Sequence, residues 1–292
     1  THPKDTTLQI GNDKDITEYR YRGANPKNYV KFNNETWRII GIFPTDDGTG
    51  KIENRIKLIK DQSIGEYKWD DGTTAYNYTQ NDNLMLLQDN NKSKVEYLEK
   101  IDKYDVMLTV PDTSGSNNWA RPATLNTELN TTYLNSLDSI SKSMIGQAKY
   151  YLGGYNASDI QKNLMYQYER KINGSTYYYG SNLNNFIGKL ALMYAGDYGY
   201  ATSDECTQNL FDYDNATCKN NNWLFKGNTE WILSQNASYN RWAFSVRSDG
   251  RVYNSDSVSY DQLAVRPVLY LTSSAKITGG DGTSSNPYTL GI

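Results

Sequence analysis

Short apolar fragments alternate with polar, Tyr-rich runs between residues 231 and 271, and this alternation limits most strongly what the chain can fold into. The fragments WIL, AFSV and VRPVLYL have the length and residue types of strands. Asp249 and Gly250 lie between apolar strand positions, and Asp-Gly there indicates a hairpin because glycine accepts a positive φ. We therefore expect a hairpin, with the apolar fragments as framework and the polar runs as a binding face.

Aromatic content supports a recognition surface. The chain has 26 Tyr and 6 Trp but only 6 Phe, which suggests that many rings lie half exposed with their polar atoms in water. Tyrosine and tryptophan give large contact areas at low entropic cost, and the Ser and Asn residues between them give adaptable hydrogen bonds. This combination is typical of antibody-like binding surfaces.

Charge and hydropathy exclude other classes of partner. The net charge is −3 and no long basic block occurs, so we expect no nucleic-acid partner. No apolar run approaches 18 residues, so we expect no membrane span in this chain. The first residues lack the pattern of a signal peptide, and we expect a leader or anchor to lie outside a chain that begins at Thr1.

Cys206 and Cys218 enclose a polar loop. The chain has no CxxC motif and no histidine near them, so a disulfide is favoured over a metal or redox site. Such a bridge contributes about 2 to 3 kcal/mol by restricting the unfolded loop. It also predicts an oxidising, extracytoplasmic compartment.

The hydrophobic pattern predicts one α+β domain over residues 1–292, with strands towards both ends that could pair. Helices and long polar loops are expected in the middle, including a helix from Thr124 with a break near Asp138. The other expected strands are residues 19–32, 35–43, 55–60, 188–194 and a short edge strand in the 279–290 turn cluster. The other expected helices are residues 84–87, 95–101 and 160–171. The expected loops and turns are residues 33–34, 44–50, 65–83 and 195–200.

Catalytic motifs are weak. His2 is the only histidine, which excludes Ser-His-Asp and Cys-His systems unless this terminal residue takes part. Acidic pairs such as Asp46 with Asp47, Asp70 with Asp71 or Asp204 with Glu205 could serve a glycosidase, but loop charges are the favoured interpretation. Asp281 in a Gly-rich turn lacks the spacing of a calcium-binding or phosphate-binding loop. We expect no enzyme activity, no cofactor and no metal.

Tryptophan and arginine positions separate framework from surface. Trp37, Trp223 and Trp231 stand among apolar residues and are predicted core, whereas Trp119 and Trp242 have polar neighbours and fit either burial or surface contact. Arg266 precedes Pro267 in an apolar strand and is expected to pair with a carboxylate or carbonyls.

An ordered series of segments carries a resemblance to a known family: TWRIIGIF at 36–43, RIKLIKD at 55–61, NWARPATLNTELNTTYLNSL at 118–137, GKLALMYAGDYGYAT at 188–202, NNWL at 221–224, TEWILS at 229–234 and VRPVLYL at 265–271. The chain resembles bacterial surface proteins with a C-type-lectin-like fold, among them the variable proteins of diversity-generating retroelements. The resemblance implies paired terminal strands, two main helices, a small display sheet and long polar insertions. Calcium-dependent sugar-binding lectins carry Glu-Pro-Asn-like and Trp-Asn-Asp-like motifs, and neither occurs here, so calcium-dependent sugar binding is not expected.

In diversified members, adenine-directed mutagenesis yields Asn, Tyr, Ser and Asp at exposed positions. The resemblance therefore implies a candidate variable region at residues 231–271 that binds a protein or another ligand at the cell surface. The matching positions are Asn236, Ser238, Tyr239, Asn240, Arg241, Trp242, Tyr253, Ser255, Asp256, Ser257, Tyr260, Asp261 and Gln262.

Three functions remain open from the sequence. The first is a non-catalytic ligand-binding display protein, or adhesin, located outside the cell or at its surface. The second is an enzyme of the formylglycine-generating branch of the same fold, which relies on a reactive cysteine pair. The third is a structural subunit of a pilus or cell-wall layer, which would self-associate.

Overall fold

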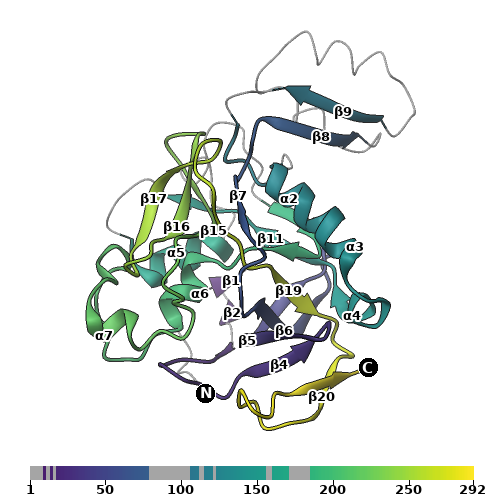
Figure 1. Cartoon of the computed structure of the whole chain (residues 1–292), viewed down its shortest axis with the longest axis vertical. Helices are drawn as coiled ribbons and strands as arrows, with labels where there is room; N and C mark the ends of the chain where they lie inside the picture. Colours follow the sequence, from purple (N-terminus) through teal and green to yellow (C-terminus); the bar gives the residue numbers. More distant parts are fainter. Residues whose placement is uncertain are drawn as a thin grey trace.

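The strand pair β5 (Glu35–Asp46) and β6 (Ile52–Lys60) lies inside the larger sheet of the computed structural model (Figure 1). The structure describes residues 9–10, 14–15, 18–78, 106–111, 115–120, 123–155, 160–170 and 185–292. β4 (Tyr29–Phe32) precedes β5 through Asn33 and Asn34, whose φ angles are 53° and 55°. Asparagine tolerates this left-handed conformation, and the two-residue turn forms where it was predicted.

The segment before this hairpin differs from the expected single strand over residues 19–32. It forms two strands, because β3 (Tyr19–Arg20) pairs with β5 at Gly41 and Ile42, whereas β4 pairs nearer the turn. Between them Gly23 has a φ of 89°, and Pro26 has no backbone N–H to donate to a sheet. The chain therefore leaves the sheet after β3 and enters it again at β4.

The seven-stranded sheet joins distant parts of the chain. Its order is β10-β19-β6-β5-β3, with β14 also paired to β19 and β4 to β5. β19 (Val268–Leu271) is buried at all four residues and lies between β6 on one side and β10 (Ile145–Gly146) and β14 (Leu190–Ala191) on the other. Burial on both faces explains its continuous apolar sequence.

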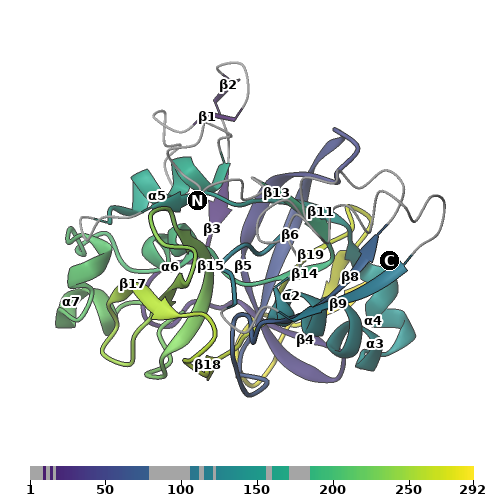
Figure 2. The ribbon, with the colours of Figure 1, turned by 90° about the horizontal axis from the view of Figure 1, so that it is seen from above.

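The six-stranded sheet is built around β15 (Glu230–Asn236), which is buried throughout. Its order is β17-β16-β15-β18-β7, and β12 (Gly154–Tyr155) pairs with β15 as well. The other bounds are Trp242–Val246 for β16, Val252–Ser257 for β17, Leu263–Ala264 for β18 and Glu66–Tyr67 for β7. Figures 1 and 2 both place β17 at an outer side of the body, away from β4.

The predicted helix from Thr124 and its break near Asp138 are confirmed. α2 (Thr124–Glu128), the π-helical turn η2 (Leu129–Tyr133) and α3 (Leu134–Ser136) follow one another without a gap. Asp138 then caps α4 (Ser139–Met144) by accepting a hydrogen bond of 2.8 Å from the backbone N–H of Ser141. In α4 Ile140 is 70% exposed, although it follows the three- and four-residue spacing of apolar residues that predicted the helix.

The expected turn over residues 195–200 is wrong, because this segment is helix α6 (Ala195–Tyr200). Its two glycines are required by packing: a Cβ on Gly196 would lie 2.7 Å from Oε2 of Glu169, and one on Gly199 would lie 2.7 Å from Cβ of Lys162. The expected strand over residues 188–194 is limited to β14 and the end of β13 (Asn185–Gly188). Helix α5 (Lys162–Arg170), which packs against α6, confirms the predicted helix near residues 160–171.

The expected loop over residues 65–83 contains two strands, β7 and β8 (Thr73–Tyr78). β8 pairs with β9 (Val106–Pro111) in a hairpin that projects from the body at the top of Figure 1. The helices expected at residues 84–87 and 95–101 lie outside the described residues. The remaining short strands are β1 (Gln9–Ile10), β2 (Lys14–Asp15), β11 (Ala148–Tyr151), β20 (Lys276–Gly279) and β21 (Thr289–Gly291).

The two terminal parts of the chain meet beside β4. The backbone N–H of Lys31 donates to the carbonyl of Tyr288 at 2.8 Å, and the N–H of Tyr288 donates to the carbonyl of Tyr29 at 2.8 Å. β20 and β21 pair with each other and close the turn cluster as expected. The chain is therefore a mixed α+β structure, mostly of strands with few helices, in which an N-terminal strand and a C-terminal segment pair.

The predicted disulfide is present. Cys206 and Cys218 are bonded to each other and both are buried. The loop between them folds into η4 (Leu210–Asp212) and α7 (Ala216–Lys219), each capped by an asparagine side chain. A buried bridge of this kind ties both ends of the loop to the core beneath it.

The core contains the tryptophans that were predicted for it. Trp37, Trp223 and Trp231 are at most 4% exposed. Trp119, for which burial and surface contact were both open, is also buried, and its ring centroid lies 5.1 Å from that of Trp69. Trp69 in turn contacts Trp231 at 5.7 Å, so three edge-to-face rings fill the space beside the six-stranded sheet.

Charged groups inside the framework are paired. Arg266 donates two hydrogen bonds, of 2.6 and 2.7 Å, to the carboxylate of Glu230, as the sequence predicted. Lys57 on β6 is fully buried and forms an ion pair with Asp197 of α6. Asp197 also accepts from Arg20 at 3.0 Å and from the backbone N–H of Tyr194 at 2.9 Å, so one carboxylate holds two cations and caps a helix.

Candidate functional site

The predicted hairpin between residues 242 and 257 is confirmed. β16 and β17 pair antiparallel, and the backbone N–H of Gly250 donates to the carbonyl of Arg247 at 2.9 Å to close the turn. Gly250 has a φ of 103°, and a Cβ there would lie 2.9 Å from the carbonyl oxygen of Tyr213. Glycine is therefore required at this position both for its backbone conformation and for the close contact.

Strand β17 presents every second side chain to the outside. Val252, Asn254 and Asp256 are buried, whereas Tyr253, Ser255 and Ser257 are half-buried. This is the two-residue period of a strand with one face on the protein interior. β17 also lies at the end of the sheet, so its outer edge pairs with no further strand in the part of the chain that the structure describes.

The expectation that all predicted positions face outward is wrong at Asn236 and Asp256, which are 2% and 3% exposed. Asn236 accepts hydrogen bonds from the backbone N–H groups of Ser238 and Tyr239 at 2.8 and 3.1 Å. Its amide also donates to the carbonyl of Asn254 at 2.9 Å. Asn236 therefore shapes the loop that follows it, and its side chain is not available to a ligand.

Asp256 supports the hairpin from the inner face. Its carboxylate accepts from the hydroxyl of Ser245 and pairs with Arg247 at 2.9 Å. Burial raises the pKa of this carboxyl above its ordinary value, although the hydrogen bond from Ser245 and the charge of Arg247 act in the opposite direction. The period of two along β17 was the sequence signal that separates Asp256 from its outward neighbours.

The other predicted residues are exposed or half-exposed, and we call them the outer patch. Tyr260 is 83% exposed and Tyr239 is 56% exposed. The ring of Tyr239 contacts that of the half-buried Trp242, with centroids 4.4 Å apart. The outer patch comprises Ser238, Tyr239, Asn240, Arg241, Trp242, Tyr253, Ser255, Ser257, Tyr260, Asp261 and Gln262.

Backbone contacts bring the two halves of the outer patch together. Trp242 is paired with Ser257, and the N–H of Val258 donates to the carbonyl of Arg241 at 3.0 Å. Asp261 accepts from the N–H of Ser257 at 2.6 Å and closes the turn that carries Tyr260. Residues on both sides of the hairpin thus share one surface.

Tyr253 lies towards the turn end of the hairpin and has different neighbours. Its ring centroid lies 6.4 Å from that of Phe211 in η4, and the guanidinium of Arg247 lies 4.4 Å from its ring. Cation–π contacts of this type stabilise an aromatic ring that remains partly in water. The cysteine-bridged loop therefore supports this end of the outer patch, which the sequence did not predict.

Asn117 holds the loop before β16 and was missed by the sequence analysis. Its amide nitrogen lies 2.9, 3.0 and 2.8 Å from the carbonyl oxygens of Asn236, Tyr239 and Trp242. Its backbone N–H donates to the carbonyl of Asn240 at 2.6 Å. One fully buried side chain, more than 100 residues away in sequence, thus fixes the backbone that presents Tyr239 and Trp242.

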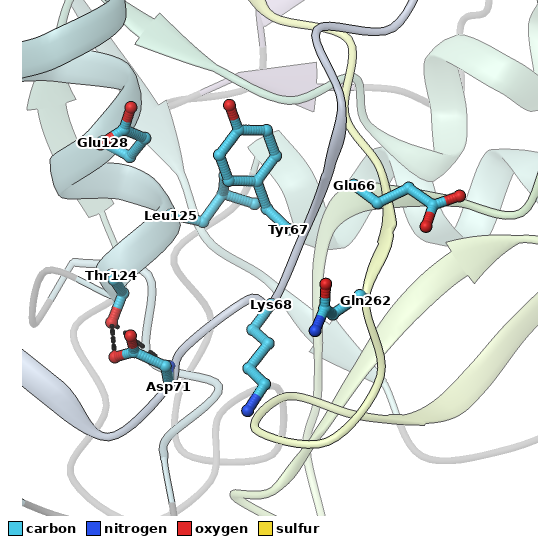
Figure 3. A pocket seen from close by; sticks show the side chains of 8 residues that line it. All are labelled: Glu66, Tyr67, Lys68, Asp71, Thr124, Leu125, Glu128 and Gln262. Carbon is cyan, nitrogen blue, oxygen red and sulfur yellow. Dashed lines mark hydrogen bonds between the residues drawn. The ribbon is translucent and has the colours of Figure 1, made fainter.

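A pocket of about 280 Å³ opens beside Gln262, the last residue of the outer patch (Figure 3). One side is formed by Glu66, Tyr67 and Lys68 at β7, and the other by α2. Its lining comes from three separate parts of the chain and has no local motif, which explains why the sequence did not indicate it. β7 pairs with β18 at Leu263, so the pocket and the outer patch belong to one sheet.

The acidic pairs considered for a glycosidase hold loops in place. Asp46 accepts from the N–H groups of Gly48 and Gly50 at 2.8 and 3.1 Å, and Asp47 from Thr49 at 2.8 Å. Asp70 is buried and accepts from the N–H of Ser116 at 2.7 Å. Asp204 pairs with Arg22.

Asp281 has a similar role in the C-terminal turn cluster. Its carboxylate accepts from the hydroxyl and the backbone N–H of Thr283 at 2.7 and 3.0 Å. Within the described ranges, no group of three or more His, Cys, Asp and Glu side chains is arranged to hold a metal ion. In the same ranges, no helix is both long enough and apolar enough to cross a lipid bilayer.

Comparison of the chain with known protein families, curated proteins and solved structures finds no match. The resemblance to variable proteins of C-type-lectin type therefore rests on the sequence segments given above. The geometry of the outer patch and of the pocket is independent of that resemblance.

Proposed function

We propose that this chain is a non-catalytic ligand-binding display protein with a C-type-lectin-like fold, located outside the cell or at its surface. The observation that carries the proposal is the separation of roles along residues 236–262. Buried Asn236 holds the backbone of the loop that follows it, and buried Asp256 is tied to Ser245 and Arg247, while the side chains of the outer patch are exposed or half-exposed. A surface built in this way can change its side chains without changing its support.

The recognition chemistry follows from the residue types of the outer patch. Tyr239, Trp242, Tyr253 and Tyr260 are the large amphipathic side chains, and aromatic residues of this type contribute most of the affinity at protein interfaces. The Ser and Asn residues between them provide hydrogen bonds that adapt to different partners. We infer that the ligand is a protein or another macromolecule at a cell surface, bound by shape and hydrogen bonding without chemistry.

The bridged cysteines favour this function over an enzyme of the formylglycine-generating type, which needs a reactive cysteine pair. Cys206 and Cys218 are bonded and buried, and they support the loop behind Tyr253. The same bridge favours an oxidising compartment outside the cytoplasm. A pilus or cell-wall subunit would instead associate with copies of itself, which sedimentation of the purified chain measures.

A pair of libraries tests the display function. The first randomises Tyr239, Trp242, Tyr253 and Tyr260 among Asn, Tyr, Ser and Asp, and the matched control randomises Ala243, Phe244, Val246 and Val252 in the same way. We expect most clones of the first library to keep Tm within about 4 °C of the parent, because partly exposed substitutions cost little. Most clones of the control library should unfold.

Selection then tests binding. The folded clones of the first library are selected against a purified protein that the parent does not bind, and we expect clones with new binding to be recovered. Loss of folded protein from the first library at the rate of the control would contradict the display function.

The gene neighbourhood tests diversification separately. We expect a nearby reverse transcriptase gene and an imperfect copy of the segment encoding residues 231–266 that differs at adenines. Buried Asn236 and Asp256 should vary less between copies than Tyr239 and Tyr260. Equal variation at buried and outward positions would argue against the support role of the buried residues.

A further inference from the structure

The pocket beside Gln262 lies at one edge of the outer patch. Gln262 is two residues from Tyr260, the most exposed aromatic residue of the outer patch. Figure 3 shows the side chain of Gln262 between Glu66 and Lys68, facing the helix that carries Leu125 and Glu128. A macromolecule that contacts Tyr260 therefore has this pocket within reach of its neighbouring side chains.

The walls of the pocket are held in place by the core. The indole N–H of Trp231 donates to the carbonyl of Tyr67 at 2.8 Å, and the N–H of Leu125 donates to the carbonyl of Trp69 at 3.1 Å. The hydroxyl of Thr124 donates to Asp71 at 2.7 Å across the base of the pocket. The cavity is thus preformed, and a ligand need not order it.

The lining combines apolar surface with negative charge. The half-buried ring of Tyr67 contributes the apolar surface, while Glu66, Asp71 and Glu128 contribute three carboxylates against the single ammonium of Lys68, a formal charge of −2. The carboxylates of Glu66 and Glu128 form no hydrogen bond or ion pair with any residue that the structure describes. Lys68 extends away from Glu128, so the side next to Leu125 and Tyr67 keeps its negative charge.

We propose that this pocket binds an arginine side chain of the protein ligand that the outer patch recognises. The planar guanidinium stacks on the half-buried ring of Tyr67, and Glu128 accepts its N–H groups. A volume of about 280 Å³ has room for one arginine side chain and lies at the lower end of ligand pockets, which span roughly 300 to 1,000 Å³. The inference rests on the proposed function, because it names one feature of the partner.

Arginine is favoured over lysine for a physical reason. A guanidinium is planar, less strongly hydrated than an ammonium, and able to stack on a ring while it donates to a carboxylate. The pocket offers a ring and a carboxylate on adjacent walls. We therefore expect an arginine probe to bind more tightly than the lysine analogue.

The probe that tests this is N-acetyl-arginine methylamide, titrated into the whole chain and followed by amide chemical shifts in NMR. The neutral citrulline analogue, which has almost the same shape, is the matched control and should not bind measurably. Glu128→Gln should weaken arginine binding roughly threefold to fivefold, as expected for one partly exposed charge pair. Lys68→Gln should strengthen it roughly twofold, because it removes the opposing charge.

A control variant separates a local effect from a change in net charge. Glu205→Gln removes an exposed carboxylate immediately before the cysteine-bridged loop and should leave arginine binding unchanged. Equal effects of Glu128→Gln and Glu205→Gln, or equal binding of arginine and citrulline, would overturn the arginine site. Unchanged Tm in each variant shows that the fold is intact.

Failure of this inference is distinguishable from failure of the proposed function. If clones from the outer-patch library bind protein targets and replacement of target arginines never weakens them, the display function stands and the arginine site is wrong. If the probe binds but no clone binds any protein target, the pocket is a site for a small cation and the proposed protein partner is wrong. Targets that lose binding on arginine replacement, together with loss on Glu128→Gln, support both.

Discussion

Two antiparallel strand pairs of this chain use polar side chains in opposite ways. In β5 the apolar run is buried except at Ile42, which is 38% exposed, and the charged Lys57 of β6 is enclosed with Asp197. In β16 and β17 every second residue of β17 faces outward, and its buried Asp256 is tied to Ser245 and Arg247. The first pair buries most of its central side chains, whereas β17 of the second pair alternates buried and half-exposed positions.

The comparison teaches that polarity alone does not identify a binding residue in this chain. Asn236 and Tyr239 stand in the same polar run, but one is buried and holds the loop while the other is exposed. The deciding property is whether the side chain satisfies backbone groups beneath it. Substitutions should therefore have very different costs at residues that look alike in sequence.

The largest effect is expected at the framework ion pair. Asp197→Ala removes the carboxylate that pairs with fully buried Lys57 and one of the two carboxylates that pair with Arg20. The uncompensated charge of Lys57 should lower the free energy of unfolding by about 3 to 5 kcal/mol. Urea denaturation measures the loss. Asp212→Asn, on an exposed residue, is the control and should change stability by less than about 0.5 kcal/mol. A similar loss of free energy of unfolding in both variants would contradict the larger role in stability that we assign to the buried ion pair.

The disulfide should have the next largest effect. Replacement of both Cys206 and Cys218 by alanine should lower stability by about 2 to 3 kcal/mol, because the unfolded loop regains its freedom. Thiol titration of the native protein should find no free thiol. Two fast-reacting thiols would contradict the structural bridge and favour the enzyme with a reactive cysteine pair.

The outer patch should separate binding from stability. Tyr260→Ala should change the free energy of unfolding by less than about 0.5 kcal/mol, because the side chain is 83% exposed. The same change should weaken ligand binding by more than about 1 kcal/mol, measured on a clone that retains Tyr260. Phe244→Ala on the buried strand beside it should cost about 3 to 5 kcal/mol of stability. Unfolding of the Tyr260 variant would place this residue in the core.

The smallest effect is expected for the pH dependence of stability that Asp256 causes in the β16–β17 hairpin. Burial raises the pKa of Asp256 above 3.8, so the unfolded chain ionises first as pH rises, and this residue lowers stability above the raised pKa. Asp256→Asn removes this loss of stability, because asparagine does not ionise. The stability of the variant relative to wild type should therefore improve between pH 3 and pH 7, as measured by thermal unfolding across the range.

Asp249, at the turn of the same hairpin, should change stability with pH in the opposite direction to Asp256. Burial acts to raise its pKa, but hydrogen bonds with the side chain and backbone of Arg251 outweigh it and the pKa is lowered. Because the pKa is lower in the folded state, ionised Asp249 stabilises the fold at pH values above the pKa of the unfolded chain. This stabilisation is lost as pH falls through the folded-state pKa. Asp249→Asn should thus worsen relative to wild type as pH rises. If the stability of Asp256→Asn and of Asp249→Asn, each relative to wild type, changed in the same direction with pH, the two carboxylates would not differ in their surroundings as described.

Local chemistry in the sequence was enough for several elements. Asn33 with Asn34 and Asp249 with Gly250 predicted their turns, because few residues adopt a positive φ. A helix break was predicted near Asp138, where α4 begins, and the disulfide was predicted because the two cysteines have no CxxC motif and no histidine near them. Each of these signals depends on atoms within a few residues of each other or on a covalent bond between two like residues.

Contacts between distant segments decided the rest. Helix α6 was missed because its glycines indicate a turn until Glu169 and Lys162 are packed against them. Asn117 could not be singled out among the many asparagines, since its role exists only when the loop before β16 is beside it. The pocket at Gln262 requires β7, α2 and the start of β18 to meet.

The sequence by itself determined where this chain turns, which strands are apolar and which segment is rich in recognition side chains, because those properties depend on neighbouring residues. Only the tertiary structure decided which of those side chains face outward. Burial depends on what lies opposite a residue in space, and for Asn236 and Asp256 that is the backbone of the hairpin itself or the side chains it carries.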